Sequence, residues 1–154
     1  MLLNYTTKIE ADKTAQEIAK CLSLHGAQAV LTEYDEKEQI VSAISFRIKM
    51  GEQVMSFRLP CDWHPVYDIL VKQKKLPNTW VRNYESAVAE RKLQAVRTAW
   101  RIVKDWVEAQ MALVETQMVT TGQVFLPYLL MKDERTLSQH IAENPNMLQL
   151  GSGE

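Results

Sequence analysis

Two pairs of cysteine and histidine are the side chains in this 154-residue chain that are best suited to chemistry. Cys21 and His25 lie four positions apart, and Cys61 and His64 lie three apart. Thiolates and imidazoles are zinc ligands, so the four residues could converge as a metal site. Neither pair has the C-x₂-C form of a strong zinc motif, and Cys21 falls beside an apolar helical stripe, where a thiol is commonly a small buried hydrophobe. We expect no metal or cofactor, and the sequence leaves open whether the pairs meet.

Asp62 and His64 form a second arrangement with chemical potential. A carboxylate can orient an imidazole that acts as a general base, but catalysis also needs a nucleophile or a substrate pocket, and the sequence nominates neither. An aspartate shortly before Pro65 is a typical helix N-cap. The sequence has no Gly-rich phosphate loop, no H-E-x-x-H and no G-x-S-x-G. It therefore predicts no catalytic residue and a protein that is not an enzyme.

Charge is unevenly distributed along the chain, although the net charge is only −1. Residues 72–104 hold 9 basic and 2 acidic side chains, whereas residues 1–71 hold 7 and 10, and residues 105–154 hold 2 and 7. The candidate binding residues are ten of the cations and aromatics of this basic block: Lys72, Lys74, Lys75, Trp80, Arg82, Tyr84, Arg91, Arg97, Arg101 and Lys104.

The basic block predicts a nucleic-acid interface. Arg97, Arg101 and Lys104 recur at helical spacing, so they should project from one face of a helix. Such a face attracts phosphates through counterion release, and Trp80 and Tyr84 could stack on unpaired bases. A plain solvated face and a protein partner are the alternatives, because a helix that is buried on its other sides carries charge on its free side. The sequence pI near 6.3 argues against a general DNA-coating protein.

The amino-terminal half must supply a helix and a sheet to position these groups. Thr14 and Glu17 match a capping box, and apolar residues recur at helical spacing from there until His25. After that helix, apolar and polar residues alternate along three segments, as they do in β-strands. The connections between the segments are short, which predicts an antiparallel meander with one face available for helices to cover. The three strands are expected over residues 27–34, 40–50 and 53–59.

The carboxy-terminal half is expected to be helical. Residues 85–119 contain no glycine or proline and carry two adjacent apolar lines, which predicts one long helix that ends at Thr120-Thr121-Gly122. Shorter helices are expected over residues 62–76 and 135–143. A helix of about 35 residues is roughly 50 Å long, more than the width of about 40 Å for a compact chain of this size. Either it bends, or one end projects and finds a partner. The two apolar lines are covered either by the chain's own sheet and terminal helices or by self-association through this helix.

Length and composition predict one globular domain, and the pattern of helices and strands makes it an α+β domain over residues 1–150. The helix and meander occupy residues 1–62, the helical half occupies 63–150, and residues 151–154 form a frayed tail. No apolar run reaches the roughly 18 residues of a membrane span, and the first ten residues lack the order of a signal peptide. Two cysteines do not make a secreted disulfide framework. We therefore expect a cytoplasmic protein with no membrane partner.

Several strings of residues resemble a family of small accessory proteins carried by phages and prophages of Gram-positive bacteria. The strings that carry the resemblance are Asn4-Tyr5-Thr6-Thr7, His25-Gly26-Ala27, Phe57-Arg58-Leu59-Pro60, Trp100 through Gln110, and Val124-Phe125-Leu126-Pro127-Tyr128. The resemblance implies a mobile-element protein working in the bacterial host cell. It transfers no activity or catalytic residue. It suits either a nucleic-acid binder or an anti-defence inhibitor, such as an anti-CRISPR protein, that binds a host nuclease complex.

Overall fold

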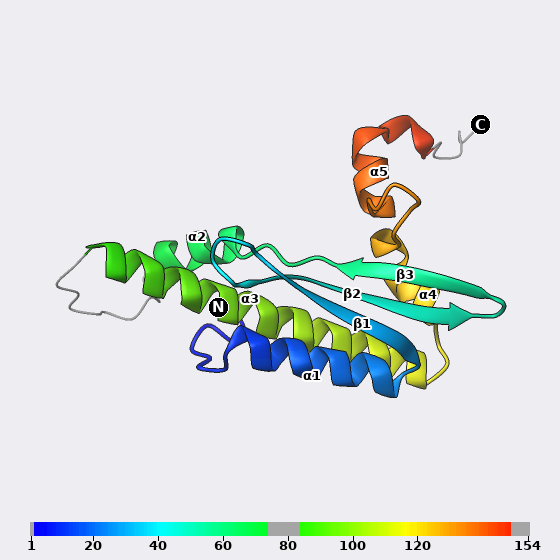
Figure 1. The fold of residues 1–154 in the computed structure, drawn as a ribbon, viewed down its shortest axis with the longest axis horizontal. Helices are drawn as coiled ribbons and strands as arrows, with labels where there is room; N and C mark the ends of the chain where they lie inside the picture. Colours follow the sequence, from blue (N-terminus) through cyan, green and yellow to red (C-terminus); the bar gives the residue numbers. More distant parts are fainter. Residues whose placement is uncertain (1, 74–83, 149–154) are drawn as a thin grey trace.

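The computed structural model describes residues 2–73 and 84–148, without the side chains of residues 84, 85 and 87. Figure 1 shows an amino-terminal helix, a three-stranded antiparallel sheet and a helical remainder dominated by one long helix. The predicted α+β class is confirmed. The elements are α1 (Ala11–Leu24), β1 (Ala27–Tyr34), β2 (Val41–Met50), β3 (Gln53–Leu59), α2 (His64–Lys72), α3 (Tyr84–Glu115), α4 (Thr121–Phe125), α5 (Leu137–Glu143) and the 3₁₀ turns η1 (Leu126–Tyr128) and η2 (Pro145–Met147).

The sheet has the order β1-β2-β3 and buries one face against α1 and α3. Alternation along β2 places Ile44, Phe46 and Ile48 on the buried face. The register with β1 skips Ser42, because Glu33 pairs with Ala43 and Tyr34 pairs with Val41. This irregularity explains why Val41 is buried although simple alternation would place it on the opposite face.

The core lies between the sheet and two helices that run in the same direction. Glu10 at the start of α1 pairs with Arg97 near the middle of α3, and His25 at the end of α1 lies 3.9 Å from Glu115 at the end of α3. Trp100 of α3 is buried at the centre, where its indole N–H donates to the Val41 carbonyl at 3.1 Å. The burial of both helices against one sheet face fixes the orientation of α3.

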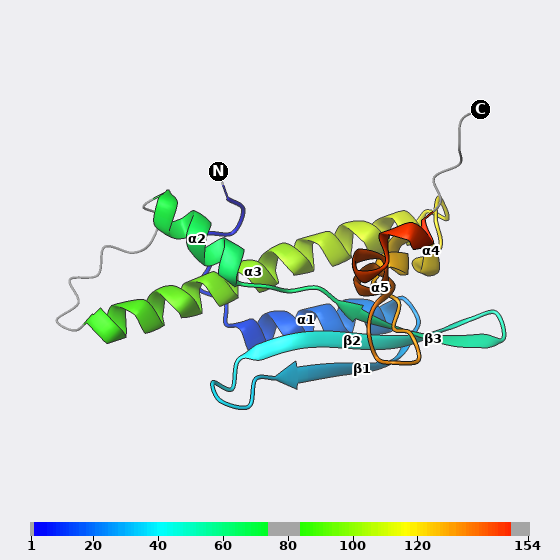
Figure 2. The same ribbon diagram turned by 90° about the horizontal axis from the view of Figure 1, so that it is seen from above.

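The long helix projects beyond the sheet at its amino-terminal end. It has 32 residues, and Figure 2 shows this end extending past the strands with α2 packed beside it. Of the two outcomes expected for so long a rod, the structure shows projection. Ala95, Val96 and Ala99 are buried by the chain itself, whereas Leu113 remains partly exposed. In the part of the chain that the structure describes, no helix is long and apolar enough to cross a membrane.

The chain after α3 returns to the edge of β3 and forms a carboxy-terminal arm (residues 126–148). Leu129 forms a bridge with Phe57, and the Leu130 amide donates to the Ser56 carbonyl at 2.8 Å. Figure 1 shows α5 rising away from the sheet beyond this attachment. The arm therefore occupies the outer edge of β3.

Several predicted helix ends are wrong. The Thr14–Glu17 capping box does not form, because α1 begins one turn earlier at Ala11 and Thr14 is buried within it. The long helix ends at Glu115 rather than at Val119.

Two caps with the same local chemistry do form elsewhere in the chain. Thr120 and Gln123 cap α4, a helix that the sequence analysis missed, and Thr136 and Gln139 cap α5. Thr120 and Thr136 are the N-cap residues of their helices, whereas Thr14 lies inside α1, so only the first two can form a capping box.

Candidate functional site

The two cysteine–histidine pairs do not come together. Among the described residues, no group of three or more histidine, cysteine, aspartate or glutamate side chains is placed to hold a metal ion. The His25 ring lies 2.8 Å from the Cys21 carbonyl within α1, and His64 lies 2.7 Å from Asp62. Each pair is therefore explained by its own local contacts.

The Cys61 thiol is expected to react slowly. Burial, with a smaller effect from the neighbouring Asp62 carboxylate, raises the pKa of Cys61 to about 12. At pH 8 this leaves roughly a thousandfold less thiolate than an ordinary cysteine has. Alkylation by iodoacetamide, followed by mass spectrometry, should therefore be far slower at Cys61 in the folded chain than in guanidinium. Equal rates under the two conditions would contradict this assignment.

The Asp62 carboxylate contacts both the ring and the amide of His64 at the start of α2. It accepts a hydrogen bond from the His64 amide at 3.0 Å, and its contacts with His64 hold the pKa of the Asp62 carboxyl below its usual range. The N-cap position itself is held by Trp63, one residue later than predicted. Trp63 stacks on the His64 ring with 3.9 Å between centroids, so the imidazole is packed against the helix start.

The ten predicted binding residues divide into three groups. Lys74, Lys75, Trp80 and Arg82 lie outside the described residues, as does the side chain of Tyr84 at the start of α3. Lys72 is exposed at the end of α2, and Arg91 is partly buried. The remaining three are Arg97, Arg101 and Lys104 on α3, which helical spacing correctly places together.

Carboxylates of the same chain pair with all three of these cations. The Arg97 guanidinium lies 2.8 Å from the Glu10 carboxylate, Arg101 pairs with Glu17, and the Lys104 amine lies 2.6 Å from Glu108. The Arg101 and Lys104 side chains are only 15% and 14% exposed. The Arg97 and Arg101 pairs therefore form an ion-paired seam between α1 and α3, whereas the Lys104 pair lies within α3. This face has less free positive charge than the sequence suggests.

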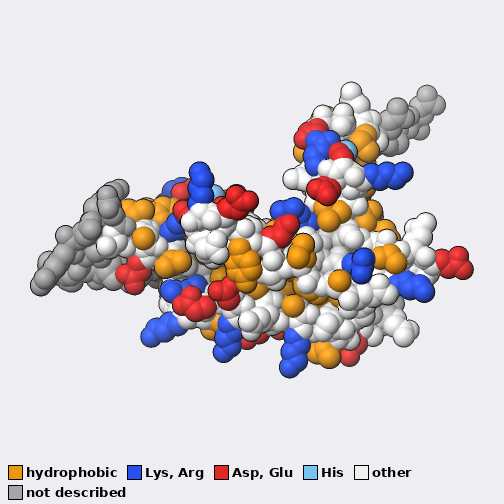
Figure 3. Space-filling model, in the orientation of Figure 1, with side chains coloured by type: hydrophobic (Ala, Val, Ile, Leu, Met, Phe, Trp, Pro, Cys, Tyr) orange, Lys and Arg blue, Asp and Glu red, His pale blue; other side chains and the backbone are white. Residues whose placement is uncertain are grey.

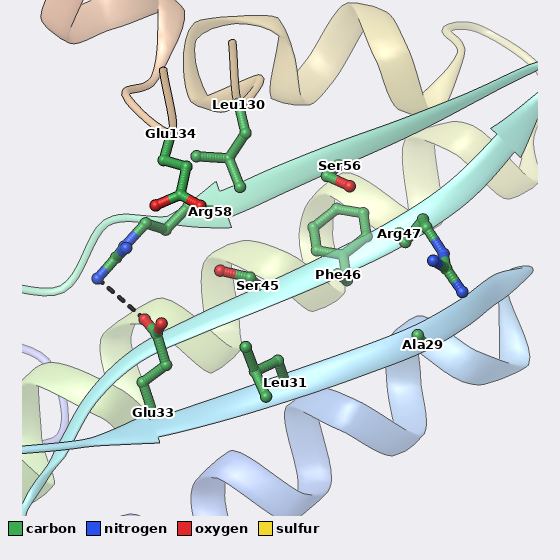
Figure 4. A pocket seen from close by; sticks show the side chains of 10 residues that line it. All are labelled: Ala29, Leu31, Glu33, Ser45, Phe46, Arg47, Ser56, Arg58, Leu130 and Glu134. Carbon is green, nitrogen blue, oxygen red and sulfur yellow. Dashed lines mark ion pairs between the residues drawn. The ribbon is translucent and has the colours of Figure 1, made fainter. Parts of the chain in front are cut away.

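A groove lies on the outer face of the sheet, opposite the face that α1 and α3 cover. It has a volume of about 380 Å³, and Figure 4 shows all three strands forming its floor while the carboxy-terminal arm forms a wall. The lining residues are Ala29, Leu31, Glu33, Ser45, Phe46, Arg47, Ser56, Arg58, Leu130 and Glu134.

The strand register builds the groove from short side chains between longer ones. Ala29 is paired with Arg47, and Arg47 with Ser56; one row along, Leu31 is paired with Ser45, and Ser45 with Arg58. Because residues two apart share a face, the small residues leave a depression between the arginines and Leu31. Figure 4 shows these side chains pointing toward the viewer from neighbouring strands.

An ion pair crosses one end of the groove. The Arg58 guanidinium on β3 lies 2.9 Å from the Glu33 carboxylate on β1 and so reaches across β2 (Figure 4). Ala43, the register partner of Glu33, is buried although it shares the outer face by alternation. This ion pair fixes Arg58, whereas Arg47 is exposed and forms no ion pair with a described residue, so one positive charge in the groove is unpaired.

The wall is held by its own polar cluster. Hydrogen bonds from His140 and Arg135 hold the pKa of the Asp133 carboxyl well below its usual range. The Arg135 guanidinium also pairs with Glu143, and the Met131 amide donates to the Arg135 carbonyl at 2.9 Å. These contacts close the loop that carries Leu130 and Glu134, so the groove is bounded by folded structure on that side.

Sequence reasoning missed this groove. Its floor consists of small and polar residues that match no motif, and its wall comes from the last third of the chain. One usable signal is present, because alternation places Leu31 on the same face of the strand as Glu33, where an apolar side chain is unexpected. The structure leaves this leucine 59% exposed. Figure 3 shows apolar and charged side chains mixed on this side of the molecule.

The fold defines the chain as an α+β protein with a meander covered on one face by two helices that run parallel to each other. No protein-family model, curated protein or solved structure matches this chain. The resemblance to phage accessory proteins therefore stays a prediction.

Proposed function

We propose that this chain is a non-enzymatic accessory protein of a phage or other mobile element, and that it acts by binding a protein of the host cell. The observation that carries the proposal is the groove of about 380 Å³ on the outer sheet face. Concave surfaces that combine apolar contacts with a few placed polar groups are typical binding sites. The pairing of Arg97, Arg101 and Lys104 with carboxylates favours this function over nucleic-acid binding.

The lining of the groove favours a particular kind of partner surface. Leu31 and Leu130 offer an apolar contact, and the unpaired Arg47 offers a guanidinium to a carboxylate. A projecting segment with an apolar side chain next to an aspartate or glutamate would satisfy both. We propose a host defence nuclease complex as the partner, in the manner of an anti-CRISPR inhibitor, which fits the resemblance to mobile-element proteins.

The test is inhibition of a purified CRISPR effector complex. The wild-type chain should bind the effector in a pull-down and slow target cleavage. Arg47→Glu should weaken binding about tenfold or more, because it places an acid where the partner's carboxylate would lie. Lys49→Glu is the matched control, since Lys49 is an exposed cation on the same strand that does not line the groove.

Two outcomes would contradict the proposal. Equal losses in Arg47→Glu and Lys49→Glu would show that overall charge, rather than the groove, determines binding. Absence of binding to every effector and nuclease complex of the host range would exclude the anti-defence role.

Nucleic-acid binding remains the second candidate. Lys72 is exposed without an ion pair to a described residue, and Lys74, Lys75 and Arg82 follow it in the sequence. None of these four cations belongs to the seam, and cations of this kind bind phosphates.

A further inference from the structure

The two edges of the sheet differ in how they are covered. On β3, Leu129 and Leu130 of the carboxy-terminal arm pair with Phe57 and Ser56. No described segment pairs with the outer edge of β1, and Figure 2 shows β1 as the outermost strand. An uncovered edge offers a row of backbone donors and acceptors to another strand.

Between the irregularities near its two ends, strand β1 lacks the usual features that protect an edge strand from pairing. It contains no proline or lysine, and its one charged side chain, Glu33, is engaged by Arg58. Register shifts occur near both ends, so the regular segment is Ala29–Glu33 with Leu31 at its centre. Leu31 is 59% exposed there. The edge is therefore suited to a strand that covers this leucine.

Helix α1 borders the same edge with a row of complementary side chains. Asp12 accepts a hydrogen bond from the Tyr34 hydroxyl at one end of β1. Lys20 lines a hollow of about 360 Å³ beside the other end, together with Ala27 through Val30 of β1. Gln16 is exposed midway, and helical spacing places Asp12, Gln16 and Lys20 in one row. From the amino-terminal end of α1, the row therefore presents an acid, an amide and a base.

We propose that the occupant of this edge is a second copy of the same chain, with the two β1 strands antiparallel about a two-fold axis near Leu31. An axis at Leu31 reverses the α1 row about Gln16. Asp12 of each copy then faces Lys20 of the other, so the row is complementary to itself. Self-complementarity of one patch is the requirement for a closed two-fold dimer. Neither Asp12 nor Lys20 forms an ion pair within its own described chain, so both charges remain available.

The dimer would have consequences for the whole molecule. Two sheets of three strands would become one continuous sheet of six, and the two Leu31 side chains would cover each other on the outer face. The apolar lines of α3, proposed above as a self-association surface, would not be needed. The dimer does not rest on the proposed function, because Asp12 and Lys20 lie outside the groove. Leu31 lines the groove as well, so a partner that contacts Leu31 there would compete with the dimer.

Sedimentation equilibrium with charge variants tests the proposal. The wild-type chain should show about twice the monomer mass of 17.7 kDa at micromolar concentration. Lys20→Glu alone sets acid against acid, and Asp12→Lys alone sets base against base, so each should raise the dimer dissociation constant about tenfold. An equimolar mixture of the two variants should recover wild-type affinity, because each acid again meets a base in the heterodimer.

Lys132→Glu is the matched control, since Lys132 is an exposed cation on the carboxy-terminal arm, away from β1. Far-UV circular dichroism verifies that every variant is folded. The proposal would be overturned if the wild-type chain had a mass of 17.7 kDa at about 100 µM. It would also be overturned if neither single variant changed the dimer dissociation constant, or if the mixture of variants did not regain the wild-type value. Effector binding by the Lys20→Glu monomer would show that the groove functions without the dimer, which separates the two ideas.

Discussion

Replacement of Trp100 by alanine is expected to lower the free energy of unfolding by about 3–5 kcal/mol, the usual cost of removing a large aromatic side chain from a core. Trp100 is 1% exposed and belongs to the core cluster that joins α3 to α1 and the sheet. Its removal also leaves the Val41 carbonyl without its indole donor. That carbonyl belongs to the irregular end of β2, so the variant should loosen the strand near the turn. Urea denaturation followed by circular dichroism measures the change.

Two further substitutions separate packing from hydrogen bonding at this position. Trp100→Phe keeps much of the buried volume but removes the donor, and should cost about 1–2 kcal/mol. Leu113→Ala changes the same helix at a site that is 39% exposed, and should cost less than about 1 kcal/mol. If Trp100→Ala were as mild as Leu113→Ala, Trp100 would not be the centre of the core.

The strands could be predicted because their pattern is local. In β2, apolar Ile44, Phe46 and Ile48 alternate with polar residues. The pleat of a strand is enough to place the two sets on opposite faces of the sheet. Helix ends were harder, since they depend on what packs against them. Thr14 matches a capping motif, yet burial against the core places it inside α1. The end of α3 at Glu115 follows from Gln117, whose φ of 63° breaks the helix without any glycine.

The functional surfaces could not be predicted in the same way, because their contacts join distant residues. Arg97 and Glu10 are 87 positions apart, and nothing in the spacing of α3 reveals that an acid of α1 will face it. The helical face was predicted correctly as a set of neighbouring cations, but its free charge was overestimated. The groove depends on the arm reaching back to β3 through Leu130, which is a tertiary event.

Reversal of both seam arginines, Arg97→Glu with Arg101→Glu, is expected to destabilise the chain by about 2–4 kcal/mol. Each substitution replaces an ion pair between α1 and α3 with two facing carboxylates, and Arg101 is the more buried of the two. Removing one partner of a buried ion pair costs about 3–5 kcal/mol, and breaking an exposed ion pair costs under about 1 kcal/mol. The two arginine pairs are partly exposed, so the expected loss of stability lies between these limits. Thermal denaturation should show a lower midpoint for the double variant than for the wild type.

The same seam provides a decisive test of nucleic-acid binding. The charge-reversed variant would lose affinity for DNA whether it lost phosphate contacts or unfolded, so it cannot distinguish these two causes. Glu10→Gln with Glu17→Gln instead frees Arg97 and Arg101 while leaving every cation in place. If this face binds phosphates, the variant must bind DNA more tightly than the wild type, with a steeper dependence on salt concentration. We expect no such gain, because the arginines of this seam serve to hold α1 against α3.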